Sequence, residues 1–207
     1  MKCYKIRELL TPCGEDEMKT PDAQYVAVLT FPEWKKKSEI FDMLIDIELD
    51  PSDSGETKAI VNYDSLTGCF SIPDRENISG KRHSFAFALD EKGIVLIDDE
   101  HFAAGLVEEV RRTKKWRFPS LERFLYDLLE KIIKDDLHLL ETMENRLNRL
   151  EEEILQGDVN EYPPELNNVR GDLLDLRMHY EQLIDVGQEL EENENGFFRQ
   201  ENLRFFR

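Results

Sequence analysis

Long apolar runs are missing from this chain, and their absence limits its possible functions. The longest apolar stretches, residues 85–89 and 94–97, fall far short of the ~20 residues that a membrane-spanning helix needs. Residues 1–7 contain no apolar segment that could act as a signal peptide. We therefore expect the chain to be soluble, with no part that crosses a membrane.

Cysteine and histidine are scarce, which argues against the sites they usually build. The three cysteines are odd in number and include no C-x-x-C pair, so we expect reduced thiols and neither a disulfide framework nor a zinc site. The four histidines stand in separate segments without an H-E-x-x-H motif. Neither glycine-rich phosphate-binding motif occurs among the ten glycines. These absences predict that the chain is not an enzyme.

Basic residues are few beside acidic ones, with 27 Lys and Arg against 45 Asp and Glu and a net charge of −18. A field of this sign repels phosphate backbones, so we expect no nucleic-acid partner. It attracts cations, and it suits hydrated divalent ions wherever carboxylates converge. Plain solubility is the simpler explanation of the same charge.

The pattern that is present over residues 1–118 predicts a mixed α/β head. Strands are expected at 2–10, 25–29, 58–63, 69–72, 84–89 and 94–97, with residues 11–24 as a loop. Helices are expected after a Thr30–Glu33 capping box and from Asp98 or Asp99 to about residue 115. Gly93 suits a left-handed bulge position. The strand after it is apolar throughout, which predicts helices on both faces of a mixed sheet of about six strands.

Residues 119–196 predict a long antiparallel helical hairpin packed on this head. Ser120 is a natural N-cap for a first helix of about 36 residues, and a second helix with a heptad seam follows the Pro163-Pro164 turn. Asp136 interrupts the first apolar stripe, and we expect it to pair with Arg170 or Arg177. The fold class is therefore α+β, an α/β/α layered head plus the hairpin. Residues 197–207 resemble the start of a further, truncated helix.

Four segments of the hairpin carry a resemblance to a known family: LYDLL at 125–129, DDLHLLE at 135–141, LEEEIL at 150–155 and LLDLR at 173–177. Together with the order of elements in the head, they resemble the cytosolic domain of the CorA family of magnesium channels. The Gly-Met-Asn triplet and the two membrane helices of that family are absent from this sequence. The resemblance implies that the chain is the cytosolic part of a longer polypeptide, and that residues 197–207 begin the stalk helix leading to the pore.

The resemblance also implies a function. Family members form homopentamers at the cytoplasmic face of the cell membrane, and regulatory Mg²⁺ bound between neighbouring protomers holds the channel shut. One family site places an acidic residue in a short segment that matches residues 43–48 here. Asp46 is the implied metal ligand, with Asp42 and Glu48 behind it.

Two other functions stay open at this stage. One is a stand-alone interaction or scaffold protein, with an α/β head and a coiled coil that binds partner helices through its seam. The other is an enzyme with a carboxylate-based metal centre, which has little support because no acidic cluster has ligand spacing tied to a histidine. The sequence leaves open which ion is transported, in which direction, and whether the chain oligomerises alone.

Overall fold

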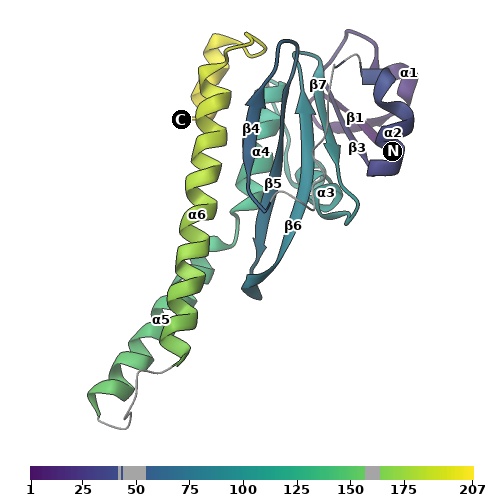
Figure 1. Cartoon of the computed structure of the whole chain (residues 1–207). Helices are drawn as coiled ribbons and strands as arrows, with labels where there is room; N and C mark the ends of the chain where they lie inside the picture. Colours follow the sequence, from purple (N-terminus) through teal and green to yellow (C-terminus); the bar gives the residue numbers. More distant parts are fainter. Residues whose placement is uncertain (42, 44–54, 157–163) are drawn as a thin grey trace.

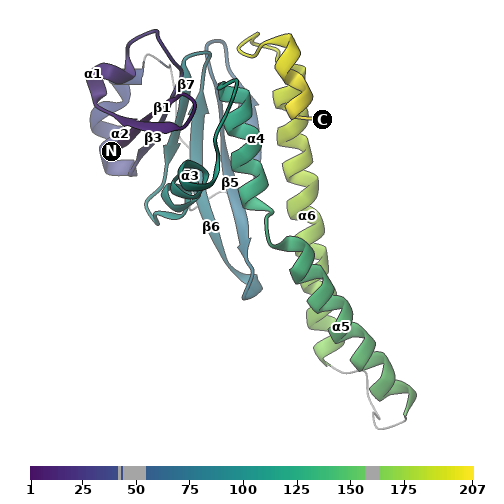
Figure 2. The same ribbon diagram turned by 180° about the vertical axis from the view of Figure 1, so that it is seen from behind.

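The computed structural model describes residues 1–41, 43, 55–156 and 164–207. A twisted sheet carries helices on both faces, and a helical arm extends well past one end of the sheet (Figures 1 and 2). This arrangement confirms the predicted α+β class with a layered head and a helical hairpin. Among the described residues, no helix combines the length and the apolar character that crossing a bilayer requires.

Within the described residues the sheet has seven strands in the order β2-β1-β3-β7-β6-β5-β4. Only β3 and β7 pair in parallel, and the other neighbours are antiparallel, so the sheet is mixed as predicted. The strands are β1 (Lys2–Ile6), β2 (Leu10–Cys13), β3 (Tyr25–Leu29), β4 (Lys58–Val61), β5 (Leu66–Asp74), β6 (Asn77–Leu89) and β7 (Gly93–Ile97).

The prediction of about six strands misses β2, because the sequence pattern predicts one strand over residues 2–10 and a loop over 11–24. The chain instead turns between Ile6 and Leu10, and β2 pairs back onto β1. Pro12 lies opposite Tyr4 on this edge strand, where a missing N–H breaks no ladder of a central strand. Because of this proline, the sequence pattern did not predict β2.

The prediction that Gly93 takes a left-handed bulge conformation is wrong. Gly196 is the glycine with positive φ among the described residues, so Gly93 occupies no left-handed position. A Cβ added at Gly93 would lie 2.4 Å from the carbonyl oxygen of Tyr25, its register partner in β3. Close approach of two backbones, rather than turn geometry, requires glycine here.

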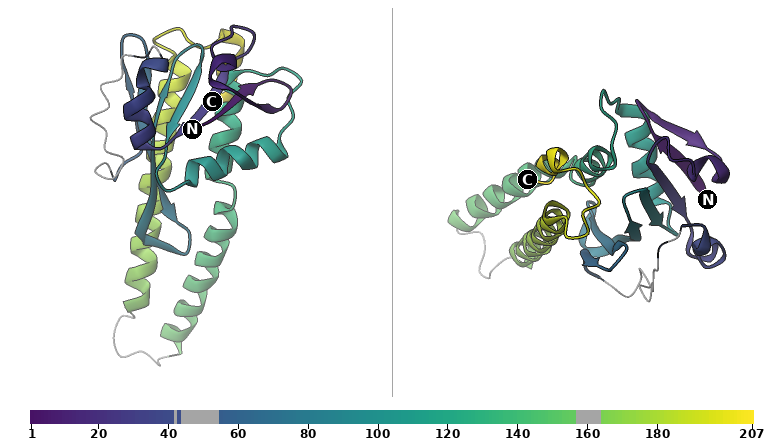
Figure 3. Two further views of the ribbon diagram at one scale, coloured as in Figure 1. Left: turned by 90° about the vertical axis from the view of Figure 1, so that its right-hand side faces the viewer. Right: turned by 90° about the horizontal axis from the view of Figure 1, so that it is seen from above.

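Helices cover both faces of the sheet, as the fully buried strand β7 predicted (Figure 3). One face packs against Met18, Trp34 and Phe41, and the other against side chains such as Val107 and Leu128. The first face carries the short elements α1 (Glu15–Met18), α2 (Phe31–Lys37) and the 3-10 helix η1 (Ser38–Phe41). The second carries α3 (Phe102–Thr113), α4 (Leu121–Ile132) and part of α6 (Pro164–Glu192).

Two of the three predicted helix caps are present, and the one predicted for α3 is not. Thr30 and Glu33 form the capping box of α2, and the hydroxyl of Ser120 accepts from the backbone N–H of Arg123 at the start of α4. The prediction that Asp98 or Asp99 caps α3 is wrong, because α3 begins at Phe102 with His101 as its N-cap. Both aspartates still bind helix backbone: Asp98 accepts from the backbone N–H of Ala104 in α3, and Asp99 accepts from that of Phe31 in α2. The loop after β7 thus fixes the first turns of helices on opposite faces of the sheet.

The first long helix of the hairpin is broken, which corrects the prediction of one helix of about 36 residues. It consists of α4, which ends at Ile132, and α5 (Asp136–Leu155). α4 shares the core of the head, whereas α5 runs beside the far part of α6 as the arm, with Met143, Val169 and Leu176 in its core (Figure 2). The division at residues 118 and 119 into domains stays a prediction.

Residues 197–207 fold back on the head. Phe198 and Leu203 are buried, and residues Gln200–Phe205 form a short 3-10 helix, η2. The ring of Phe205 lies 5.9 Å from that of Tyr126 in α4. Whether a stalk helix starts from this segment stays a prediction.

Candidate functional site

The three predicted metal ligands, Asp42, Asp46 and Glu48, lie outside the described residues. The described residues beside them are firmly packed. Phe41 is 2% exposed, and its ring stacks on Trp34 with centroids 5.7 Å apart. Met43 is also buried against the same face of the sheet.

Over residues 1–41, 43, 55–156 and 164–207, no group of three or more His, Cys, Asp or Glu side chains is arranged to hold a metal ion. Two carboxylates nevertheless meet at one hydroxyl. The Oγ of Ser79 lies 2.8 Å from Asp172 Oδ1 and 2.9 Å from Asp175 Oδ2. A hydroxyl donates one hydrogen, so it can satisfy only one of these oxygens. The three oxygens are of the hard type that Mg²⁺ prefers, at the point where β6 meets α6.

A second polar group, which we call the junction, lies where the arm leaves the head. It consists of Arg75, Asp136 and Tyr180. Arg75 Nη2 lies 2.7 Å from Asp136 Oδ1 and also donates to the carbonyl of Ile132, the last residue of α4. The hydroxyl of Tyr180 in α6 donates to Asp136 Oδ2 at 3.1 Å. One carboxylate therefore joins the β5–β6 turn, the break in the first hairpin helix and α6.

The predicted partners of Asp136 were wrong. Arg177 pairs instead with Glu181, one turn further along α6, at 2.8 Å on the exposed face. The cation comes from Arg75, which is 61 positions earlier in the chain. Nothing in the hairpin sequence points to this residue, because the strand pattern predicts a shorter β5 and β6 than the structure has.

His179 is buried beside the junction and is held neutral. Burial is the main cause, and the nearby cation Arg82 adds to it; together they lower the pKa of His179 to about 4. Its Nδ1 has no hydrogen-bond partner among the described residues. Burial and the neighbouring carboxylate of Asp136 raise the pKa of Tyr180 to about 12, so its hydroxyl stays a donor. The junction is thus built around the Arg75–Asp136 pair, with a neutral His179 and a neutral Tyr180 beside it.

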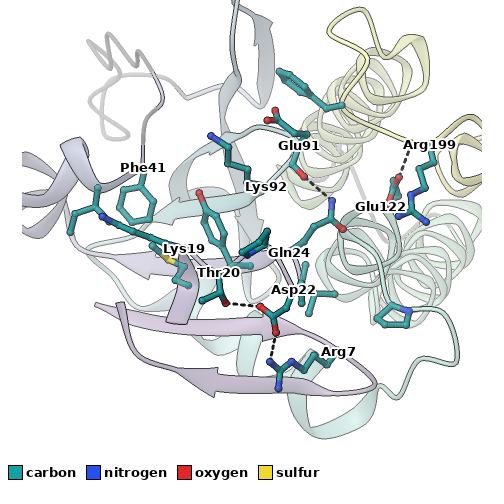
Figure 4. Close-up of a pocket in the computed structure, with 18 of the residues that line it drawn as sticks. Arg7, Lys19, Thr20, Asp22, Gln24, Phe41, Glu91, Lys92, Glu122 and Arg199 are labelled. Atoms are coloured by element: carbon teal, nitrogen blue, oxygen red, sulfur yellow. Dashed lines mark hydrogen bonds and ion pairs between the residues drawn. The ribbon is translucent and has the colours of Figure 1, made fainter. Parts of the chain in front are cut away.

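A cleft of about 950 Å³ opens on the opposite side of the head, near the C-terminal segment (Figure 4). It is bounded by residues 18–25, Glu91 and Lys92 between β6 and β7, the start of α4 and Arg199. Its lining carries charges of both signs, among them Lys19, Glu39 and Glu91. A lining of mixed sign lacks the concentrated potential that marks a phosphate or cation site.

A buried lysine fixes one wall of this cleft. Lys5 is 2% exposed, and its ammonium group donates to the carbonyls of Met18, Thr20 and Ala23. The same nitrogen lies 3.1 Å from Asp22 Oδ1. Hydrogen bonds from Thr20 and Arg7, with Lys5, hold the pKa of Asp22 well below its usual range. No sequence signal marks this role, because a lysine in an alternating strand is normally placed on the solvent face.

Two side chains connect the far wall to the rest of the head. Gln24 donates to the carbonyl of Glu91 and accepts from the backbone N–H of Leu121, joining the β6–β7 turn to α4. Glu122 is 2% exposed, and its Oε1 accepts from the backbone N–H of Arg199 at 2.9 Å. Its Oε2 has no hydrogen-bond partner in the described part of the chain. A buried glutamate thereby ties the C-terminal segment to the first turn of α4.

Comparison with solved structures finds the same fold over the whole chain. The full-length CmaX protein superposes with a TM-score of 0.73 at 14% identity, covering 100% of this chain and 67% of that one. The soluble domain of CorA from Methanocaldococcus jannaschii gives 0.72 at 16% identity, covering 100% and 85%. The ZntB cytoplasmic domain from Vibrio parahaemolyticus gives 0.62 at 12% identity, with the same coverage. Identities this low show a shared fold alone.

A comparison with curated protein sequences finds no match. The family described as CorA-like Mg²⁺ transporter protein matches residues 41–207, which include most of the sheet, α3, the hairpin and the C-terminal segment. The matched part is well over half of the chain, and it contains all four sequence segments on which the resemblance rested. The chain belongs to the CorA-like Mg²⁺ transporter family.

Proposed function

We propose that this chain is the cytosolic, magnesium-sensing part of a CorA-like divalent-cation channel and has no enzymatic activity. The observation that carries the proposal is the family match, which runs from residue 41 to residue 207. It is supported by the common fold with structures described as the soluble domain of CorA and the cytoplasmic domain of ZntB. On this proposal the chain lies at the cytoplasmic face of the cell membrane and works as one protomer of a homopentamer.

The net charge of −18 suits a sensor that responds to loss of a divalent cation. Like charges about 4 Å apart repel by about 4 kcal/mol at an effective dielectric near 20. A divalent cation held between two acidic surfaces offsets this repulsion and favours the closed ring. When Mg²⁺ is withdrawn the repulsion returns, and the population shifts toward looser arrangements.

For the metal ligands we propose Asp46, supported by Asp42 and Glu48. Mg²⁺ gives up its water shell reluctantly, so binding through one or two carboxylates and several waters is expected. Such a site has no need of the three-ligand cluster that is missing from the described part of the chain. It also has no need of histidine or cysteine.

Calorimetric titration of the chain with Mg²⁺ tests this proposal. We expect weak, saturable binding that Asp46→Asn abolishes and that Asp16→Asn leaves unchanged; Asp16 is an exposed carboxylate on α1 and serves as the matched control. Absence of saturable binding to the unaltered chain would overturn the sensor function. Binding that survives Asp46→Asn but is lost in Asp172→Asn would overturn the assignment of Asp46 and place the site at Ser79 instead.

The alternative function, a scaffold protein, requires that the heptad seam of α6 be free to bind partner helices. The seam of α6 through which partner helices would dock is already occupied, because Val169, Leu176 and Leu190 are each at most 3% exposed. Val169 and Leu176 pack in the arm, and Leu190 packs against the head. The heptad pattern is therefore used for internal packing.

A further inference from the structure

Two of the three cysteines face each other across neighbouring strands at the edge of the sheet. In the β1–β2 register Cys3 lies directly opposite Cys13. Residues directly opposite in an antiparallel pair project to the same face, with Cα atoms about 4.5–5.5 Å apart. Disulfide-bonded cysteines have Cα separations of about 4.4–6.8 Å. The backbone therefore already has the spacing that a disulfide requires.

One of the two thiols is buried in the core and the other is partly exposed. Cys3 is 8% exposed and belongs to the cluster formed by Met18 and Trp34 under α1 and α2. Cys13 packs against the same cluster but stays partly exposed on the outermost strand. A reagent from solution would therefore reach Cys13 first, and Cys3 would be the thiol held beside it.

The thiol of Cys13 also acts electrostatically on the thiol of Cys3. Burial is the main cause that raises the pKa of Cys3 to about 11, and the neighbouring Cys13 is the next. Burial also raises the pKa of Cys13. Both groups are therefore thiols near neutral pH, and both are free in this structure.

We propose that Cys3 and Cys13 form a redox modification site, which closes as an intramolecular disulfide on exchange with a small-molecule disulfide such as oxidised glutathione. Cys13 loses its proton, and its sulfur attacks one sulfur of the small disulfide, releasing one small thiol and leaving a mixed disulfide. Cys3 then loses its proton and attacks the Cys13 sulfur, releasing the second small thiol. The protein gives up two hydrogen atoms, and the small disulfide is reduced to two thiols.

The bond would fix an edge of the head that now depends on strand pairing. It closes a loop across residues 3–13 and ties edge strand β2 to β1, next to the buried Lys5 that holds the wall of the cleft. A closed loop of this size restricts the unfolded chain, so the oxidised protein should unfold at a temperature higher by roughly 5 °C. Oxidation would thus stabilise the face that also packs Phe41 and Met43.

Cys69 provides a matched control. It lies in β5, opposite Lys58 of β4, and the strands β3, β7 and β6 stand between β5 and β1 in the sheet. Its Sγ lies 3.0 Å from the carbonyl oxygen of Glu56. The fold keeps it away from the other two thiols.

The test incubates the full chain with oxidised glutathione and maps the product by tryptic digestion and mass spectrometry. We expect the segments 3–5 and 8–19 to be recovered as one cross-linked species, in the unaltered chain and in Cys69→Ser alike. Cys3→Ser and Cys13→Ser should lose this species. Because the attacking form is the thiolate, its rate of formation should rise about tenfold per pH unit near neutrality.

Three results would overturn the proposal. They are a cross-link that involves Cys69, a disulfide between two chains, and a glutathione adduct on Cys13 that never resolves in the unaltered chain. Thermal unfolding of the oxidised and reduced proteins gives a second measurement, and an unchanged midpoint in a fully cross-linked sample would contradict the stabilisation. Circular dichroism of Cys3→Ser shows whether that variant is folded. Cys13→Ser tests loss of the cross-linked species equally well and disturbs the core less, because Cys13 is the more exposed of the two.

Discussion

Arg75, in the turn between β5 and β6, holds Asp136, the first residue of α5, through two nitrogens at 2.7 and 2.8 Å. The pair joins a loop of the head to the point where the arm begins, and Arg75 also donates to the carbonyl of Ile132 at the end of α4. This ion pair and the hydroxyl of Tyr180 act together with α6, a continuous helix that packs in both the arm and the head, to fix the direction in which the arm leaves the head.

Removing one partner of this pair should destabilise the protein markedly. Asp136 has a side chain only 9% exposed, so Arg75→Met leaves a nearly buried carboxylate without its cation. We expect a loss of about 2–3 kcal/mol in the free energy of unfolding, measured by urea denaturation. The matched control is Arg177→Met, which removes the exposed pair with Glu181 and should cost less than about 0.5 kcal/mol. Equal losses in the two variants would contradict a structural role for the junction.

Asp136 also shows what a sequence pattern can and cannot predict. Its place on an apolar stripe correctly marked it as a buried acid with a cationic partner, because a buried carboxylate needs one. The identity of the partner could not be predicted, since Arg75 lies in a hairpin whose polar end has no strand signature. The break between α4 and α5 was also missed, and it lies where this end of the hairpin contacts Ile132 and Asp136. Periodicity records which residues are buried, but it does not record which distant loop covers them.

In the head, too, features encoded in a local sequence pattern were predicted, and features that depend on distant segments were not. The capping box of α2, the apolar strand β7 and the helices on both faces of the sheet were predicted, because each follows from a local sequence pattern. Edge strand β2 was missed because it is short and contains Pro12. The buried Lys5 and Glu122 were missed because their partners are backbone groups contributed by other segments. The metal candidates Asp42, Asp46 and Glu48 came from resemblance and stay a prediction.

Gly93 and Gly105 should respond to alanine in opposite directions. A Cβ at Gly93 meets the Tyr25 carbonyl at 2.4 Å and the Tyr25 ring at 2.7 Å, so β3 and β7 would have to separate at the centre of the sheet. We expect Gly93→Ala to lower the free energy of unfolding by about 3 kcal/mol. Gly105 lies in α3, with nothing within 4 Å of an added Cβ.

Gly105→Ala should therefore stabilise the protein by about 0.5–1 kcal/mol, the difference in helix propensity between the two residues. Thermal unfolding of both variants beside the unaltered chain provides the comparison. A stable Gly93→Ala protein would show that β3 and β7 can separate freely and that close backbone approach does not require glycine at this position.

His179 should make the stability of the protein depend on pH between about 6.5 and 4. Its pKa is lowered to about 4 in the folded chain, by burial first and then by Arg82 and Arg75 acting against Asp136. In the unfolded chain a histidine titrates near 6.5, so the unfolded state binds the extra proton as the pH falls through this window. Acidification therefore favours unfolding, and the contribution is absent above about pH 7.

The difference between the unaltered chain and His179→Gln isolates this contribution. The subtraction is needed because Asp90 acts with the opposite sign: burial raises its pKa to about 6, so the folded state binds its proton more readily and gains stability as the pH falls from 6 toward 4. Between pH 7 and pH 4.5 we expect the unaltered chain to lose about 2 kcal/mol relative to His179→Gln, measured by urea denaturation at each pH. His138→Gln, at an exposed position of α5, is the matched control for replacing a histidine by glutamine. If the curves of His179→Gln and the unaltered chain stay parallel, His179 is protonated equally in both states and the packing beside the junction does not exclude its charge.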